Sequence, residues 1–166
     1  MFARHSAITA VVLAALASGC SDVTDPLAVG ATVVVQRDTL VATVTTAAAV
    51  QWMHFSLPIA IHNTSDVALS FDYCFSSIDT RIAGEWSKVW SPYCLLAAGS
   101  ATDIRPGETL QIVLSIDAAI DGPGGPQWGS RPVDGTYRFT AGFIPVGVGG
   151  RFLTVGSNAF TLIRGS

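Results

Sequence analysis

Hydrophobic and polar residues alternate along much of the chain with the period of two that is typical of β-strands. The alternation is clearest over Met53–His62, where the apolar members are Met53, Phe55, Leu57, Ile59 and Ile61. After a turn at Asn63–Asp66 it resumes over Val67–Phe75, which predicts that these two strands form a hairpin. Pro58 has no N–H, so we expect it at a bulge or with its nitrogen facing away from a neighbouring strand.

Shorter runs rich in β-branched and aromatic residues occupy the rest of the chain. Thr32–Gln36 and Leu40–Thr46 predict an opening pair of strands. Further strands are predicted at Gly84–Trp90, Leu110–Ile116, Tyr137–Phe143 and around Phe160 and Leu162, with a long surface loop over Asp121–Gly129. Seven or eight short strands without helices between them favour an antiparallel β-sandwich, and an up-and-down barrel is the alternative.

The N-terminus has the order of a secretory signal peptide. Arg4 and His5 precede the apolar stretch Ala7–Leu16, which is too short to span a bilayer as a helix. The segment that follows, Ala17–Cys20, resembles the lipobox of bacterial lipoproteins. This resemblance implies that residues 1–19 are removed and that Cys20 is acylated, with palmitate as a typical chain. Ordinary cleavage after Ala15–Ala17 is the alternative.

Three cysteines are an odd number for an exported chain. Lipidation of Cys20 accounts for one of them and leaves Cys74 and Cys94 to form a disulfide in an oxidising compartment. In the alternation of Val67–Phe75, Cys74 faces away from the apolar side chains. We therefore expect the disulfide to lie outside the core.

Residues 20–31 are small and polar and predict a tether, whereas residues 32–166 are long enough for one domain with a core. Acidic residues exceed basic ones, 12 against 9, which argues against a nucleic-acid partner. Lys88 is the only lysine, so no polybasic membrane patch is expected. The expected location is the cell envelope, with the membrane contacted through the lipid on Cys20.

Several short motifs occur in an order found in a known family. They are Asn63–Asp66, Gly84–Trp86, Pro106–Glu108, Gly135–Phe139 and Ser157–Phe160. Together they resemble a bacterial immunoglobulin-like domain family, with an outline similar to a bacterial proteinase-inhibitor domain. The resemblance implies an immunoglobulin-like antiparallel β-sandwich with a binding or structural role, and it transfers no catalytic residue. Tyr137 resembles the tyrosine corner of such folds, so we expect it to be buried and bonded to nearby backbone.

Candidate catalytic and metal-binding residues are few. No Gly-x-Ser-x-Gly elbow is present. His54 and His62 share one strand face but lie about 26 Å apart, which is too far for one metal ion. The acids of Asp117–Asp121 lack the calcium-loop pattern and are expected to be ordinary loop residues. We predict no enzymatic activity, no metal and no cofactor.

Four aromatic residues are candidates for a binding face that recognises sugars or peptides: Trp86, Trp90, Tyr93 and Trp128. The alternative is that Trp86 and Trp90 cover one sheet face as packing. The predicted function is a non-enzymatic, surface-anchored interaction or structural module. Two alternatives stay open: a protease inhibitor that presents the Asp121–Arg131 loop, and a carbohydrate-binding module.

Overall fold

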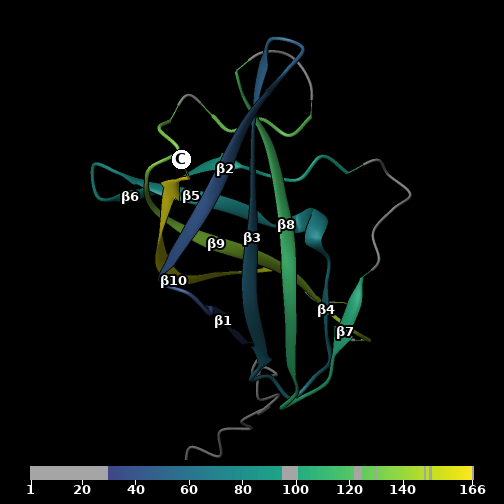
Figure 1. Ribbon diagram of the computed structural model, residues 1–166. Helices are drawn as coiled ribbons and strands as arrows, with labels where there is room; N and C mark the ends of the chain where they lie inside the picture. The colour runs from purple at the N-terminus through teal and green to yellow at the C-terminus, as the bar shows by residue number, and fades with distance from the viewer. Residues whose placement is uncertain are drawn as a thin grey trace, which may run out of the picture.

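The computed structural model describes residues 30–94, 101–121, 125–129, 131–147, 149 and 151–165. Within these ranges all regular structure is β apart from one 3-10 turn, which confirms the predicted all-β class (Figure 1). Ten strands are present rather than seven or eight, because residues 69–104 form four short strands where the alternation predicted two. The elements are β1 (Ala31–Val35), β2 (Thr39–Ala47), β3 (Val50–Asn63), β4 (Leu69–Phe71), η1 (Tyr73–Phe75), β5 (Ser77–Ile82), β6 (Glu85–Trp90), β7 (Thr102–Ile104), β8 (Thr109–Asp121), β9 (Gly135–Pro145) and β10 (Leu153–Arg164).

The predicted signal peptide, the acylated Cys20 and nearly all of the predicted tether lie outside the described residues. The described chain starts at Gly30, and β1 begins one residue later. None of the helical structure described for this chain has the length and apolar character needed to cross a membrane.

The strands form one curled, mixed sheet. Its main path runs β1-β3-β2-β10-β9-β4-β7, while β8 pairs with β3, and β5 pairs with β6 and β9. In Figure 1, β2, β3 and β8 run lengthwise at the front, and β5, β9 and β10 cross behind them. The two halves of the sheet therefore face each other and share β2.

Strand β2 pairs differently along its length. Residues Thr43–Ala47 pair antiparallel with β3, whereas Thr39–Ala42 pair in parallel with Thr161–Arg164 of β10. The prediction of a wholly antiparallel sheet is therefore wrong at this pair. The first part of β2 does not pair with β3. It lies instead beside β10 in the other half of the sheet, and β10 runs in the same direction as β2.

The predicted opening pair of strands is also incorrect, because β1 and β2 do not pair with each other. Both lie along the same edge of the long strand β3, with β1 beside Ile59–Asn63 and β2 beside Val50–His54. The residues between them, including Arg37 and Asp38, step along that edge instead of reversing the chain. Gln36 marks the step, since its N–H donates to the carbonyl oxygen of Pro58 (2.9 Å).

The turn predicted after β3 is present, but it does not close a hairpin. Asn63 is fully buried, and its side-chain amide donates to the carbonyl oxygens of Val67 and Ile104, both at 2.8 Å. Its side-chain oxygen accepts from the N–H of Ser65 (2.9 Å). This network carries the chain into the other half of the sheet, where β4 pairs with β7 and β9 instead of β3.

The alternation predicted for β3 is confirmed. Leu57, Ile59 and Ile61 are fully buried, and β3 pairs with β8 along almost its whole length. Pro58 causes no bulge. Because the nitrogen and carbonyl of a strand residue point to the same side, and the Pro58 carbonyl accepts from Gln36, the nitrogen of Pro58 faces away from β8.

The hydrophobic core lies between the two halves, and Trp128 joins them. Its ring contacts Phe55 of β3 edge to face (6.2 Å between centroids) and Tyr137 of β9 (5.1 Å). Trp128 is 1% exposed, and its backbone N–H donates to the carbonyl oxygen of Ala119 (2.8 Å). The prediction of a surface loop is therefore wrong for this residue: the chain folds back onto β8 because the indole is needed to fill the core.

Candidate functional site

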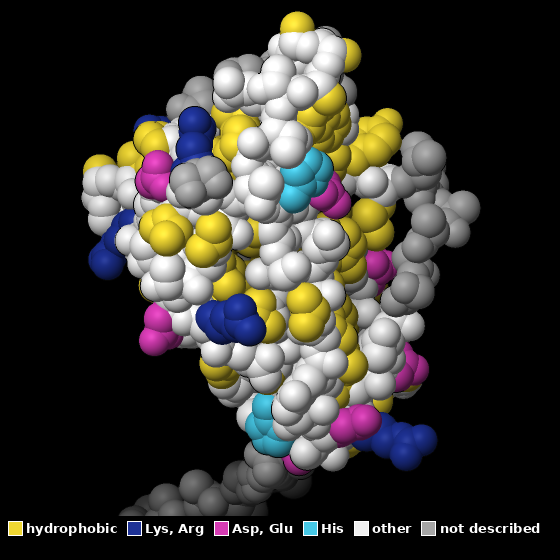
Figure 2. All heavy atoms as spheres, viewed as in Figure 1, with side chains coloured by type: hydrophobic (Ala, Val, Ile, Leu, Met, Phe, Trp, Pro, Cys, Tyr) yellow, Lys and Arg dark blue, Asp and Glu magenta, His cyan; other side chains and the backbone are white. Residues whose placement is uncertain are grey.

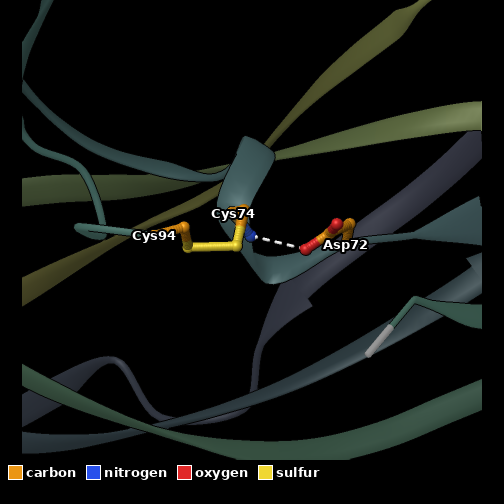
Figure 3. Close-up of a disulfide and its surroundings, with 3 residues drawn as sticks. All are labelled: Asp72, Cys74 and Cys94. Atoms are coloured by element: carbon orange, nitrogen blue, oxygen red, sulfur yellow. Dashed lines mark hydrogen bonds between the residues drawn. A yellow bond between two sulfur atoms is a disulfide. The ribbon is translucent and has the colours of Figure 1, made fainter. Parts of the chain in front are cut away.

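The predicted disulfide is present and lies outside the core. It joins Cys74 in η1 to Cys94, four residues after β6, with a Cα–Cα distance of 5.8 Å. The side chain of Asp72 caps η1 by accepting from the N–H of Cys74 (2.8 Å; Figure 3). The disulfide therefore fastens the short turn before β5 to the segment after β6.

An exposed aromatic pair lies next to this disulfide. Phe75 and Phe152 are 47% and 46% exposed, and their rings meet edge to face with centroids 5.3 Å apart. They form one side of a hollow of about 340 Å³. The remaining lining residues are Cys74, Ser76, Ser77, Lys88, Ser91, Pro92, Thr140 and Thr154. We call this hollow the disulfide groove.

The sequence did not identify the aromatic pair. Its alternation placed Phe75 on the apolar face of a strand, but the chain forms a 3-10 turn there and the ring points outward. The signal that favours this turn is Asp72, a good capping residue before a short helical turn. Phe152 follows a glycine-containing turn and belongs to no alternating run, so its sequence gave no indication of a site.

Gly142 of β9 leaves the space that the two phenylalanines occupy. A Cβ atom at position 142 would lie 2.5 Å from the ring of Phe152 and 2.6 Å from the carbonyl oxygen of Phe75. The second contact is with backbone, so a side chain here requires η1 to move. The aromatic pair thus depends on the absence of a side chain in the strand beneath it.

A buried carboxylate behind the groove fixes part of its wall. Asp79 is 6% exposed and accepts hydrogen bonds from Ser77 (3.0 Å), Thr140 (2.7 Å) and the guanidinium of Arg138 (3.1 Å). Ser77 and Thr140 are both lining residues, so this network fixes part of the groove wall. A wall fixed in this way binds without the entropic cost of ordering its side chains.

Ser76 provides an unused polar group at the same place. It lines the groove and is 4% exposed, and its hydroxyl has no hydrogen-bond partner among the described residues. Leaving a buried hydroxyl unpaired costs roughly 1 to 3 kcal/mol. A ligand that bonds this hydroxyl would remove that cost.

The four aromatic residues predicted as a binding face do not form one. Trp90 and Trp128 are 2% and 1% exposed and belong to the core. Trp86 is partly buried, and the guanidinium of Arg138 lies 4.7 Å from the centre of its ring. Only Tyr93, next to Cys94, is freely exposed at 73%. The predicted binding face is therefore wrong. The indole rings of Trp90 and Trp128 fill the core, and Arg138 covers the ring of Trp86.

Tyr73, in the same turn as Cys74, keeps a neutral phenol. Its ring packs against Trp90 with centroids 5.9 Å apart. Burial, and next the negative charge of Asp117, raise the pKa of Tyr73 to about 12. The residue therefore acts as a packing group behind the disulfide.

His54 makes polar contacts that the sequence did not predict. Its Nδ1 contacts the carboxylate of Asp117, and its Nε2 lies 3.4 Å from the hydroxyl of Thr45. This order resembles a nucleophile–base–acid row. However, Thr45 is exposed and pairs with Trp52 in the β2–β3 ladder, so the three groups lie on an open strand face where water competes for the hydroxyl.

The histidines and acids give no metal centre. The described residues contain no group of three or more histidine, cysteine or acidic side chains close enough to hold a metal ion. Asp117, predicted as a loop acid, lies within β8 and pairs with His54 instead. On the face seen in Figure 2, basic and acidic side chains are scattered among apolar ones and form no patch of a single charge.

Comparisons with known proteins found few similarities. No protein-family model and no curated protein matches the chain. Ten chains of solved structures match, among them a Northeast Structural Genomics Consortium target with 16% identity and a TM-score of 0.41, covering 81% of this chain and 83% of that one. Another, a Bordetella pertussis protein provisionally named ApaA, has 17% identity and a TM-score of 0.42, covering 82% of this chain and 94% of that one. These similarities are too weak to support an argument about function.

Proposed function

We propose that the protein is a non-enzymatic, lipid-anchored interaction module of the bacterial cell envelope, which binds a peptide segment of a partner protein in the disulfide groove. The observation that carries the proposal is the exposed Phe75–Phe152 pair, held at the edge of a hollow of about 340 Å³. Two half-exposed phenylalanine rings in contact cost free energy in water, and covering them with an apolar partner recovers it.

The chemistry of the groove favours a particular kind of peptide. Phe75, Phe152 and Pro92 offer apolar contact, Lys88 offers a positive charge, and the unpaired hydroxyl of Ser76 offers a hydrogen bond. A segment with an aromatic or aliphatic side chain next to a carboxylate matches all three. The disulfide and Asp79 hold the groove in place before the ligand arrives.

The two alternative functions have less support. Sugar rings stack on flat aromatic faces, but Phe75 and Phe152 meet at 76° and do not form a flat platform. A protease inhibitor needs a rigid, projecting loop. The described residues 125–129 fold back onto β8 instead, with Pro126 and Trp128 both bonded to Ala119.

We also infer that the domain is a variant of the immunoglobulin-like β-sandwich and that it derives from the bacterial family its motifs resemble. Two features support this inference: a core enclosed between two sheet halves, and the bond from the Tyr137 phenol to the carbonyl of Pro132, as in a tyrosine corner. The parallel pairing of β2 with β10 is a departure from the antiparallel pattern. Modules of this kind commonly act in binding, which agrees with the proposed role.

Selecting peptides that bind to the protein tests the proposal directly. The full chain with Cys20→Ser, which removes the lipid site, is immobilised and used to select from a random peptide library displayed on phage. We expect the enriched peptides to combine an aromatic or aliphatic residue with Asp or Glu. The affinity of a synthesised peptide should fall about tenfold or more when Phe152→Ala removes one ring, since truncating a central aromatic commonly costs 2 kcal/mol or more.

The matched control is Val41→Ala, which truncates another exposed apolar side chain, in β2 (58% exposed), and should not change the affinity. Gly142→Ala offers a second variant that displaces both rings without removing either. Selected peptides that bind Phe152→Ala and Gly142→Ala as tightly as the parent would rule out the groove as the binding site.

Membrane anchoring has its own test. We expect Cys20→Ser to move the protein from the membrane fraction to the soluble fraction, because a thioether-linked lipid at Cys20 is the proposed anchor. Mass spectrometry of the wild-type N-terminal peptide should show the added lipid mass. An unmodified wild-type peptide, together with unchanged fractionation of the variant, would contradict acylation.

A further inference from the structure

Over most of its length, strand β8 has one edge without a partner strand among the described residues. It pairs with β3 on one side only. On the other side, the N–H and carbonyl of Ala119 bond to Pro126 and Trp128, and the carbonyl of Asp117 accepts from the Trp90 indole (3.3 Å). In Figure 1, β8 is the outermost of the three long front strands.

The register of β8 shows which backbone groups are left over. Its pairing with β3 is regular from Thr109 to Ala119, so every second residue points to the same side. Because Ala119 and Asp117 direct their carbonyls to the free edge, the backbone groups of Thr109, Gln111, Val113 and Ser115 do so too. Among the described residues these groups have no partner.

The free edge lacks the features that normally prevent strand pairing. From Thr109 to Ile116 it carries no charge, no proline and no bulge. Val113 is 66% exposed, and the inward-facing Leu110, Ile112 and Leu114 are only partly buried. An edge of this length and composition is a template for another strand.

Two other edges of the sheet are protected. Strand β6 carries Glu85 and Lys88 and lies beside a bulge at Ile78 and Asp79. In β1, the side chain of Asn158 accepts from the N–H of Val35 (2.7 Å) and donates to its carbonyl (3.2 Å). The edge of β8 therefore lacks the protection that the edges of β6 and β1 have in the same sheet.

We propose that β8 pairs antiparallel with β8 of a second copy of this chain, about a twofold axis at Val113. We choose a second copy as the partner because the strand is complementary to itself in this register. Residues equally distant from Val113 would lie opposite each other, Gln111 with Ser115 of the second copy and Thr109 with Asp117 of the second copy. No like charges meet.

The inner face matches in the same register. Ile112 would lie opposite Leu114 of the second copy, and Leu110 opposite Ile116 of the second copy. Leu110, Ile112 and Leu114 are apolar and only partly buried in the single chain, whereas Ile116 is already fully buried. Pairing about Val113 therefore satisfies the free backbone groups and extends the hydrophobic face across the interface in one arrangement.

The test uses the full chain with Cys20→Ser, analysed by sedimentation velocity over a series of concentrations. We expect a monomer–dimer equilibrium. Val113→Lys should raise the dissociation constant about tenfold or more, because it places two like charges opposite each other at the twofold axis. Val41→Lys, which adds the same charge at another exposed strand position, should leave the equilibrium unchanged.

A cysteine in place of Val113 provides an independent measurement that does not depend on destabilising the dimer. A short thiol-specific cross-linker should join two Val113→Cys chains and should not join two Val41→Cys chains. A protein that stays monomeric at every concentration would overturn the proposal, as would a dimer that is insensitive to Val113→Lys or a failure of Val113→Cys to cross-link. A peptide bound in the disulfide groove involves neither position, so these outcomes are distinct from those that test the proposed function.

Discussion

Tyr137→Ala is expected to lower the free energy of unfolding by about 3 kcal/mol or more, measured by urea denaturation. Tyr137 is 1% exposed, and its ring lies between Trp128 and Phe160, with centroid distances of 5.1 and 6.2 Å. Truncation would leave a cavity at the point where the two halves of the sheet meet. It would also leave the carbonyl of Pro132 without the phenol that now donates to it.

Tyr137→Phe separates the two contributions. It keeps the ring and removes only the hydrogen bond to Pro132, so we expect a loss of about 1 kcal/mol. Tyr93→Ala is the control, since Tyr93 is 73% exposed and its removal should change stability by no more than about 0.5 kcal/mol. A cost below about 1 kcal/mol for Tyr137→Ala would show that the residue does not anchor the core.

Removing the disulfide should have a comparable effect. The double variant Cys74→Ser with Cys94→Ser is expected to lose about 3 kcal/mol of stability, because a closed loop of this size restricts the unfolded chain. The cross-link spans 20 residues and encloses the β5–β6 hairpin. A loss of that size is a large share of the stability of a single domain.

Chemical reduction provides the control for this variant. A reductant should destabilise the wild-type protein to about the level of the double variant and leave the double variant unchanged. Equal stability of wild type and variant, with and without reductant, would contradict a stabilising role for the disulfide.

The period of two predicted individual strands well but could not predict their partners. In β3, alternate side chains face the core and the surface, so the alternation of apolar and polar residues in the sequence matches the burial of the strand. The Pro106-Gly107 turn was also predictable, and Gly107 has the positive φ of 74° that such a turn requires. In contrast, the course of the chain after β3 depends on Asn63 reaching the carbonyl of Ile104, 41 residues away. No local pattern contains that contact.

The candidate site was harder to predict for a related reason. The cysteine count, together with the lipobox-like segment at Cys20, was enough to predict the Cys74–Cys94 disulfide. Which aromatic rings are exposed depends on how the core is filled, and Trp90 and Trp128 were needed there. Phe75 and Phe152 come together only because β9 carries Gly142 beneath them.

The shared strand β2 also affects how the domain folds. Its parallel ladder with β10 joins one of the first strands of the domain to the last, and the side chain of Asn158 reaches Val35 across 123 residues of sequence. Contacts of such high contact order form slowly, on timescales of milliseconds to seconds in all-β domains. The two halves of the sheet cannot close until the final strand has emerged. If the chain is exported from its N-terminus, as the proposed function requires, its core would stay unfinished and the edge of β2 would stay open to other strands until β10 arrives.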